Sequence, residues 1–115
     1  MASSAKDRLA LFYENYQTAF TNRAADLKAA TTAVEVERIM ANVDALETAY
    51  LDAARQTLDA SGPDIESAYQ EALAATQAVE KAYQQGKALA ARIEAVAGAV
   101  TAVGNLLTKA AAAAG

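Results

Sequence analysis

The feature that most constrains the fold is a long run of apolar residues at helical spacing in the C-terminal half. From Ile65 to Leu107, apolar or small residues recur at alternating intervals of three and four, and no charged residue interrupts the series. This period is typical of an amphipathic helix and not of a strand. The chain has one proline and five glycines, too few turn residues for a β protein of 115 residues. The sequence therefore predicts an all-α protein.

The strongest break in the pattern is Ala60-Ser61-Gly62-Pro63-Asp64. Proline suits the first turn of a helix because its missing N–H is not needed there, and Gly62 or Ser61 can cap. We expect one helix over about 32–60 and an antiparallel neighbour over 63–112. The apolar residues of the first of these two helices form one seam: Val36, Ile39, Val43, Leu46, Tyr50 and Ala53. Gly86 is in phase with the second pattern, so we interpret it as a close-packing position inside a continuous helix.

The join at Thr31-Thr32 leaves the architecture open. A first helix is expected over about 4–30, and Thr32-Ala-Val-Glu35 is a capping-box pattern that indicates a new helix. The residues that usually make a tight reversal are missing nearby. The chain is thus an antiparallel three-helix bundle with an overlong third helix, or one long helical hairpin with arms of about 75 Å. Both have coiled-coil-like seams that oligomerisation would complete.

Size and composition fit a single helical domain over residues 1–115. Hydrophobic residues make up 54% of the chain, and many are alanine, a strong helix former that fills a core poorly. The first segment holds four of the seven aromatic residues. We interpret them as an aromatic core patch that compensates for the alanine-rich seams: Phe12, Tyr13, Tyr16 and Phe20.

The missing residue types argue against an enzyme. Without cysteine or histidine the chain has no thiol chemistry, and it lacks the commonest general base and metal ligand. Paired carboxylates such as Asp44 and Glu47 are interpreted as solvated helix faces. We expect no catalytic residue, cofactor or metal. A net charge of −4 argues against nucleic acid as a partner.

The C-terminal segment is the candidate interface. From Ala95 to Gly115 the only charged side chain is Lys109. If the chain reverses at Thr31-Thr32, the second helix ends opposite about Ala91, and the apolar row beyond that point lacks a partner. We expect helix–helix association with a protein partner, with self-association favoured. The assigned interface residues are Gly86, Ile93, Val96, Val100, Val103 and Leu107.

The same segment supports an alternative, a membrane-active or secreted helical protein, because its apolar run is long enough to enter a bilayer. Asn105 and Lys109 interrupt the run and no aromatic or basic belt flanks it, so burial against protein is preferred. The first residues lack the apolar region of a signal peptide, which favours the cytoplasm and leaves secretion by a signal-peptide-independent route open. The alanine richness suggests a GC-rich bacterial genome.

One resemblance bears on the secreted alternative. A hairpin of this length with a mid-chain turn resembles the small secreted WXG-type helical hairpins in architecture. The chain has no tryptophan for their Trp-x-Gly turn. Their C-terminal Tyr-x-x-x-Asp/Glu signal is also unmatched, because Tyr83 is followed four residues later by Lys87.

Overall fold

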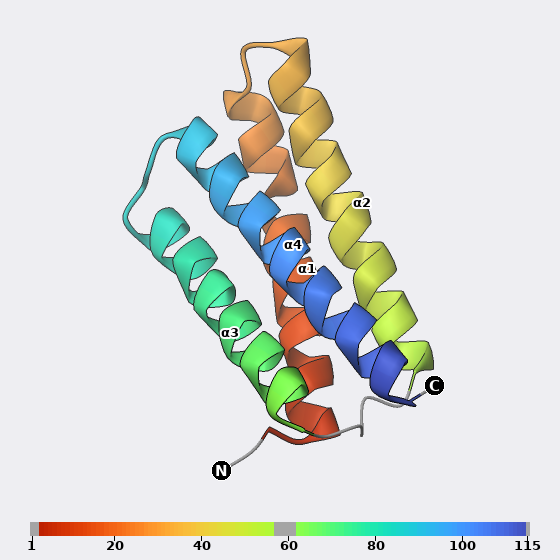
Figure 1. The fold of residues 1–115 in the computed structure, drawn as a ribbon. Helices are drawn as coiled ribbons and strands as arrows, with labels where there is room; N and C mark the ends of the chain where they lie inside the picture. The colour runs from red at the N-terminus through yellow and green to blue at the C-terminus, as the bar shows by residue number, and fades with distance from the viewer. Residues whose placement is uncertain (1–2, 57–61, 115) are drawn as a thin grey trace.

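The chain folds into an elongated helical bundle measuring 43 × 24 × 18 Å (Figure 1). The computed structural model describes residues 3–56 and 62–114, and helix accounts for 90% of them. Within these ranges lie four helices and no strand: α1 (Ala5–Ala29), α2 (Ala33–Arg55), α3 (Pro63–Gln84) and α4 (Leu89–Ala114). The predicted all-α class is confirmed. Neither predicted architecture is correct, because the chain reverses both at Thr31-Thr32 and within the expected third helix.

The reversal between α1 and α2 is made by the threonine pair. Thr32 is the N-cap of α2, and its hydroxyl accepts a hydrogen bond from the Glu35 N–H at 3.1 Å. The Glu35 carboxylate in turn accepts from the Thr31 N–H at 3.0 Å. This backbone hydrogen bond is the main reason that the pKa of Glu35 lies below its ordinary value. Ala30 is extended, so the link needs neither glycine nor proline.

The reversal between α3 and α4 corrects the interpretation of Gly86. Its φ of +60° is left-handed, a conformation that glycine adopts without steric cost. The Gly86 N–H donates to the Tyr83 carbonyl at 3.1 Å and the Lys87 N–H donates to the Ala82 carbonyl at 3.0 Å. This pair of bonds is a Schellman motif, which ends a helix. The predicted continuous helix over 63–112 is therefore wrong, and Gly86 is exposed with no atom near the place of a Cβ.

The predicted start at the proline is confirmed. Gly62 is the N-cap of α3 and Pro63 is its first residue. The preceding helix ends at Arg55, and Gln56 caps it. Residues 57–60 of the predicted helix, and Ser61 of the predicted turn, lie outside the described residues.

The helices pack as two antiparallel hairpins, α1–α2 and α3–α4. The two hairpins meet where α2 lies beside α4 and where α1 lies less closely beside α3 and α4. Over the described residues the backbones of α2 and α3 do not approach one another, so these helices occupy opposite corners (Figure 1). The order around the bundle is therefore α1, α2, α4, α3.

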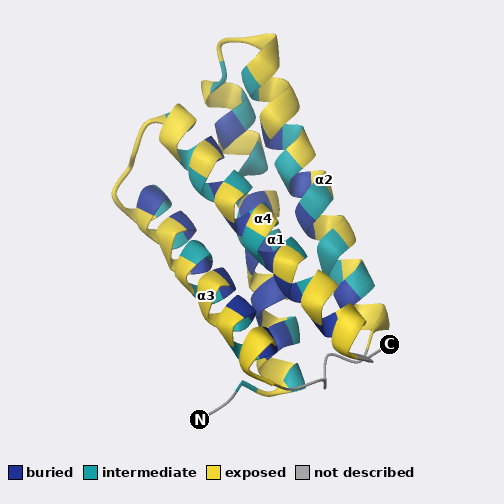
Figure 2. Ribbon diagram, in the orientation of Figure 1, coloured by how far each residue is buried: buried dark blue, intermediate teal, exposed yellow. Residues whose placement is uncertain are grey.

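The main core cluster includes residues of every helix, and Figure 2 shows buried positions along all four helices. Part of the predicted interface row lies inside the core, because Val96 and Val103 belong to this cluster. Ile93 is buried as well. Val100 and Leu107 are partly buried against the same core. The chain's own helices therefore cover this row. The expectation that it projects without a partner followed from an overlong helix that does not exist.

Candidate functional site

The candidate site is a cluster of rings on the outer side of the α1–α2 hairpin, here called the aromatic face. It consists of Tyr13, Tyr16 and Phe20 on α1 and Tyr50 on α2. Tyr13 is 46% exposed and Phe20 is 48% exposed, whereas Phe12 is 1% exposed. The predicted aromatic core patch is therefore confirmed for Phe12 and holds in part for Tyr16, which is partly buried against the core, but it is wrong for Tyr13 and Phe20. Residues 12 and 13 are successive on a helix, so they point about 100° apart.

The four rings form one continuous cluster across the two helices. The Tyr13 and Tyr50 ring centroids are 5.2 Å apart with the planes tilted by 56°. Tyr16 stacks on Tyr50 at 6.0 Å with an interplanar angle of 10°, and Tyr16 lies 5.9 Å from Phe20. These separations fall in the range where aromatic pairs attract. The rings thus hold one another in place while part of their surface faces water.

Charged groups lie directly against this cluster. The Tyr16 hydroxyl donates a hydrogen bond to Glu47 Oε2 at 3.1 Å, which is the main reason that the pKa of Tyr16 is raised. The Arg23 guanidinium lies 4.9 Å from the Phe20 ring centroid, within cation–π range. Asp44 and Glu47 are both exposed and lie one turn apart on α2. The aromatic face therefore combines ring surfaces that can accept a cation with an acidic edge.

Sequence reasoning missed the contribution of Tyr50. Its position fits the apolar row of the second helix, which predicts a buried seam residue. In the structure the reversal at Thr31-Thr32 brings Tyr50 against Tyr13 and Tyr16. The apolar residues Val34, Val36 and Leu51 of α2 are exposed as well. No local pattern identifies this surface, because it depends on how α1 and α2 pair.

The buried polar groups between α1 and α3 join the helices. Asn15 Nδ2 donates to Thr76 Oγ1 at 2.8 Å and to the Leu11 carbonyl at 2.9 Å. The Thr76 hydroxyl donates to the Ala72 carbonyl at 2.7 Å. Asn15 and Thr76 thus satisfy each other across the seam, which favours a structural role.

A second buried cluster joins three helices around Asp26. The Asp26 carboxylate accepts a hydrogen bond from Arg92 Nη2 at 3.0 Å and another from the Tyr83 hydroxyl. Burial, together with the bond to Asp26, raises the pKa of Tyr83 well above its ordinary value. The cavity beside this cluster measures about 10 Å³, room for about one water molecule. It is too small for a substrate.

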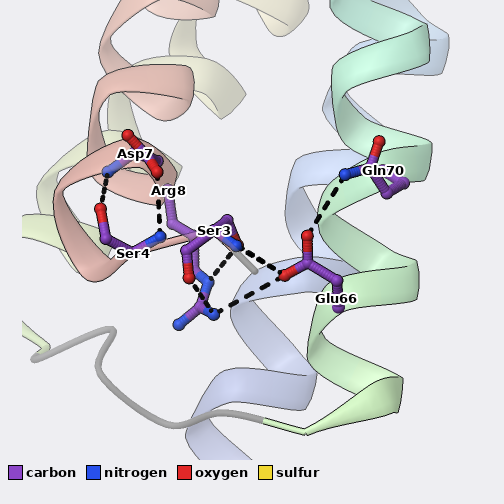
Figure 3. A network of polar contacts seen from close by, with 6 residues as sticks. All are labelled: Ser3, Ser4, Asp7, Arg8, Glu66 and Gln70. Atoms are coloured by element: carbon purple, nitrogen blue, oxygen red, sulfur yellow. Dashed lines mark hydrogen bonds and ion pairs between the residues drawn. The ribbon is translucent and has the colours of Figure 1, made fainter. Parts of the chain in front are cut away.

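A third polar network ties the start of α1 to α3 (Figure 3). The Ser3 N–H and hydroxyl donate to Glu66 Oε2 at 3.0 and 2.8 Å. The Arg8 side chain, which is buried, donates from Nε to Ser3 Oγ at 2.9 Å and from Nη2 to the Ser3 carbonyl at 2.8 Å. The Ser3 backbone bond is the main reason that the pKa of Glu66 is lowered. This network also serves to connect helices.

Metal ligands and known relatives add no further site. Over residues 3–56 and 62–114, no group of three or more acidic, histidine or cysteine residues is placed to hold a metal ion. No protein-family model, curated protein or solved structure matches this chain. The aromatic face is therefore the candidate functional surface of the described residues.

Proposed function

We propose that this protein is a non-enzymatic binding module that holds a protein partner on the aromatic face. The observation that carries the proposal is the half exposure of Tyr13 and Phe20 within an ordered ring cluster. Tyrosine and phenylalanine are enriched at protein interfaces, because each ring offers a large contact area with few torsions to fix. Rings already held by their neighbours lose little further entropy on binding.

The interior polar groups favour binding over catalysis. Asn15, Thr76, Asp26 and Tyr83 each bond to a group on another helix, and these bonds account for their burial. The chain also lacks histidine and cysteine. A ring cluster on the surface is better suited to contact than to proton transfer.

Photo-crosslinking tests the proposal. The probe p-benzoylphenylalanine replaces Tyr13 in one variant and Thr101, an exposed residue of α4, in a control. In cells that naturally produce the protein, we expect a discrete protein adduct from position 13 and none from position 101. Light scattering of the purified chain shows whether the partner is a second copy. A monomer at high concentration with no adduct from position 13 would contradict the proposal.

A second candidate function, membrane association through α4, is supported by composition. In the described part of the chain, Leu89–Ala113 is the helix long and apolar enough to cross a membrane. Its exposed side carries the uncharged residues Gly98, Thr101 and Asn105 together with the charged Glu94 and Lys109. Its large apolar residues face the bundle core, which explains the hydropathy without lipid and ranks this candidate second. Flotation with neutral and anionic liposomes tests it, and a chain that stays in the soluble fraction with both removes it.

A further inference from the structure

We propose that the partner seated on the aromatic face is a basic amphipathic helix, with an apolar ridge flanked by lysine or arginine. This inference rests on the proposed function and adds the chemistry of the partner. Its supports are the cation already bound to one ring, the charge beside the rings and the length of the cluster.

The first support is the contact between Arg23 and Phe20. The guanidinium carbon lies 4.9 Å from the ring centroid, so this cluster already holds a cation supplied by the chain itself. A cation is attracted to the negative face of an aromatic ring, and the attraction grows when water is excluded. The exposed ring of Tyr13 offers the same chemistry to a cation from outside.

The second support is the sign of the charge beside the rings. Asp44 and Glu47 are exposed on α2, and the bond from Tyr16 holds the Glu47 carboxylate next to the cluster. On α1 the exposed neighbours Gln17 and Ala24 are uncharged. The Arg23 guanidinium, held over Phe20, is one positive charge against two carboxylates, so this surface keeps an excess of negative charge. The chain as a whole carries a net charge of −4. Charge complementarity therefore selects a basic partner over an acidic one.

The third support is the length of the cluster. Residues 13 and 20 are seven positions apart on α1, which corresponds to about 10 Å along the helix axis. A partner helix presents side chains at positions i, i+3, i+4 and i+7 over the same length. Rings from both α1 and α2 meet on this surface, so a helix lying along the hairpin contacts both.

A second copy of this chain fits the surface less well. Symmetric pairing through the aromatic face would place four carboxylates, Asp44 and Glu47 of each copy, at one interface with two Arg23 side chains to offset them. Like charges brought together at an interface oppose association. The occupant is therefore a different, basic chain.

A titration with model peptides tests the inference. The probe is a 15-residue helical peptide of leucine and lysine, about four turns long, compared with a leucine and glutamate peptide of the same pattern. We expect the lysine peptide to shift the ring resonances of Tyr13, Tyr16, Phe20 and Tyr50 saturably, and the glutamate peptide to bind at least about tenfold more weakly. Circular dichroism confirms that each variant used is folded.

Two matched variants locate the charge effect. Asp44→Asn with Glu47→Gln should weaken binding of the lysine peptide about fivefold, as expected for two exposed ion pairs. Asp64→Asn with Glu71→Gln makes the same charge change on exposed positions of α3 and should leave the affinity unchanged. Equal weakening by both pairs would show general attraction and overturn the inference.

The outcomes separate this inference from the proposed function. Equal binding of both peptides to the rings, or a crosslinked partner at position 13 that is not basic, overturns the basic helix and leaves the binding module standing. If neither peptide binds the rings and position 13 gives no crosslinked adduct, both the basic-helix inference and the proposed binding function are overturned. Selective binding of the lysine peptide that depends on Asp44 and Glu47 supports the inference.

Discussion

The two hairpins of the bundle solve the same packing problem with different residues. The α3–α4 hairpin is the most closely packed helix pair, and its buried positions include Ala68, Ala72 and Ala99. The α1–α2 hairpin carries the stacked rings. Over the described residues, every exposed large hydrophobic side chain belongs to α1 or α2: Tyr13, Phe20, Val34, Val36 and Leu51.

The difference follows from side-chain size. Alanine lets the backbones of α3 and α4 approach closely. The larger side chains Val103 and Leu106 of α4 then fill the space inside the bundle. Rings beside a helix–helix seam extend past it, and their outer parts remain in water. The alanine-rich hairpin therefore supplies most of the closed interior, whereas the aromatic hairpin supplies the exposed ring surface.

The largest expected effect is in the closed interior. Val103 is 0% exposed, so Val103→Asp buries an unpaired carboxylate and should cost more than about 4 kcal/mol, enough to unfold many domains. Thr101→Asp, on the exposed side of α4, should change the free energy of unfolding by less than about 0.5 kcal/mol. Urea unfolding followed by circular dichroism measures both. If the Val103→Asp variant stays folded but changes its oligomeric state, then Val103 lies at an interface between two copies of the chain and not in the core of one.

The next effect separates core from surface within the aromatic hairpin. Phe12 is 1% exposed and Phe20 is 48% exposed. Phe12→Ala should therefore cost about 3–5 kcal/mol by leaving a cavity. Phe20→Ala should cost less than about 1.5 kcal/mol, because it loses contacts to Tyr16 and Arg23 and opens no cavity. Denaturant unfolding measures both variants. If Phe12→Ala and Phe20→Ala lower the free energy of unfolding equally, Phe20 is part of the core.

A smaller effect distinguishes the glycine that ends α3 from one inside α4. Gly86→Ala forces a side chain into the left-handed region and should destabilise by about 1 kcal/mol. Gly98→Ala, in a helix with open space around the Cβ position, should stabilise by about 0.5–1 kcal/mol. Gly86→Asn should lose less than Gly86→Ala, because asparagine tolerates this conformation. Thermal unfolding measures these changes. If Gly86→Ala raises the melting temperature, Gly86 lies inside a continuous helix and α3 does not end there.

The smallest effect probes the junction between the hairpins. A side-chain hydrogen bond with Glu80, burial and the Glu80 charge raise the pKa of Glu14 from 4.5 to about 7. Between these values the folded chain binds a proton that the unfolded chain has released, so the free energy of unfolding falls as pH rises. Glu14→Gln should therefore gain stability over the wild type progressively from pH 4.5 to 7.

Thermal unfolding across that pH range measures the gain. Glu80→Gln should produce the same pH dependence, and the double variant should add little, because either change removes the repulsion between the carboxylates. A gain from Glu14→Gln that is equal at every pH would show that the two groups do not interact.

Local residue chemistry predicted much of the fold. Pro63 with its N-cap glycine marked the start of α3, and Thr32 with Glu35 marked the start of α2. The apolar row of the second helix correctly identified the buried positions Ile39, Val43, Leu46 and Ala53, whereas Val36 of the same row is exposed and Tyr50 is only partly buried. These features depend on a few neighbouring residues or on one helix face, so they can be read without knowing what lies opposite.

Other features depended on parts of the chain far apart. The unbroken spacing through Gly86 hid a reversal, because the short link between Gln84 and Leu89 leaves the apolar positions of the two helices in step with one three-and-four spacing. The burial of Ile93 and Val96 and the exposure of Tyr13 and Phe20 were likewise decided by which helices pair and how closely. The helical character of the chain and the residues that favour a seam follow from the sequence alone. Which seams close and which rings stay in water depends on the tertiary structure, because the burial of a residue depends on what packs against it as well as on its own side chain.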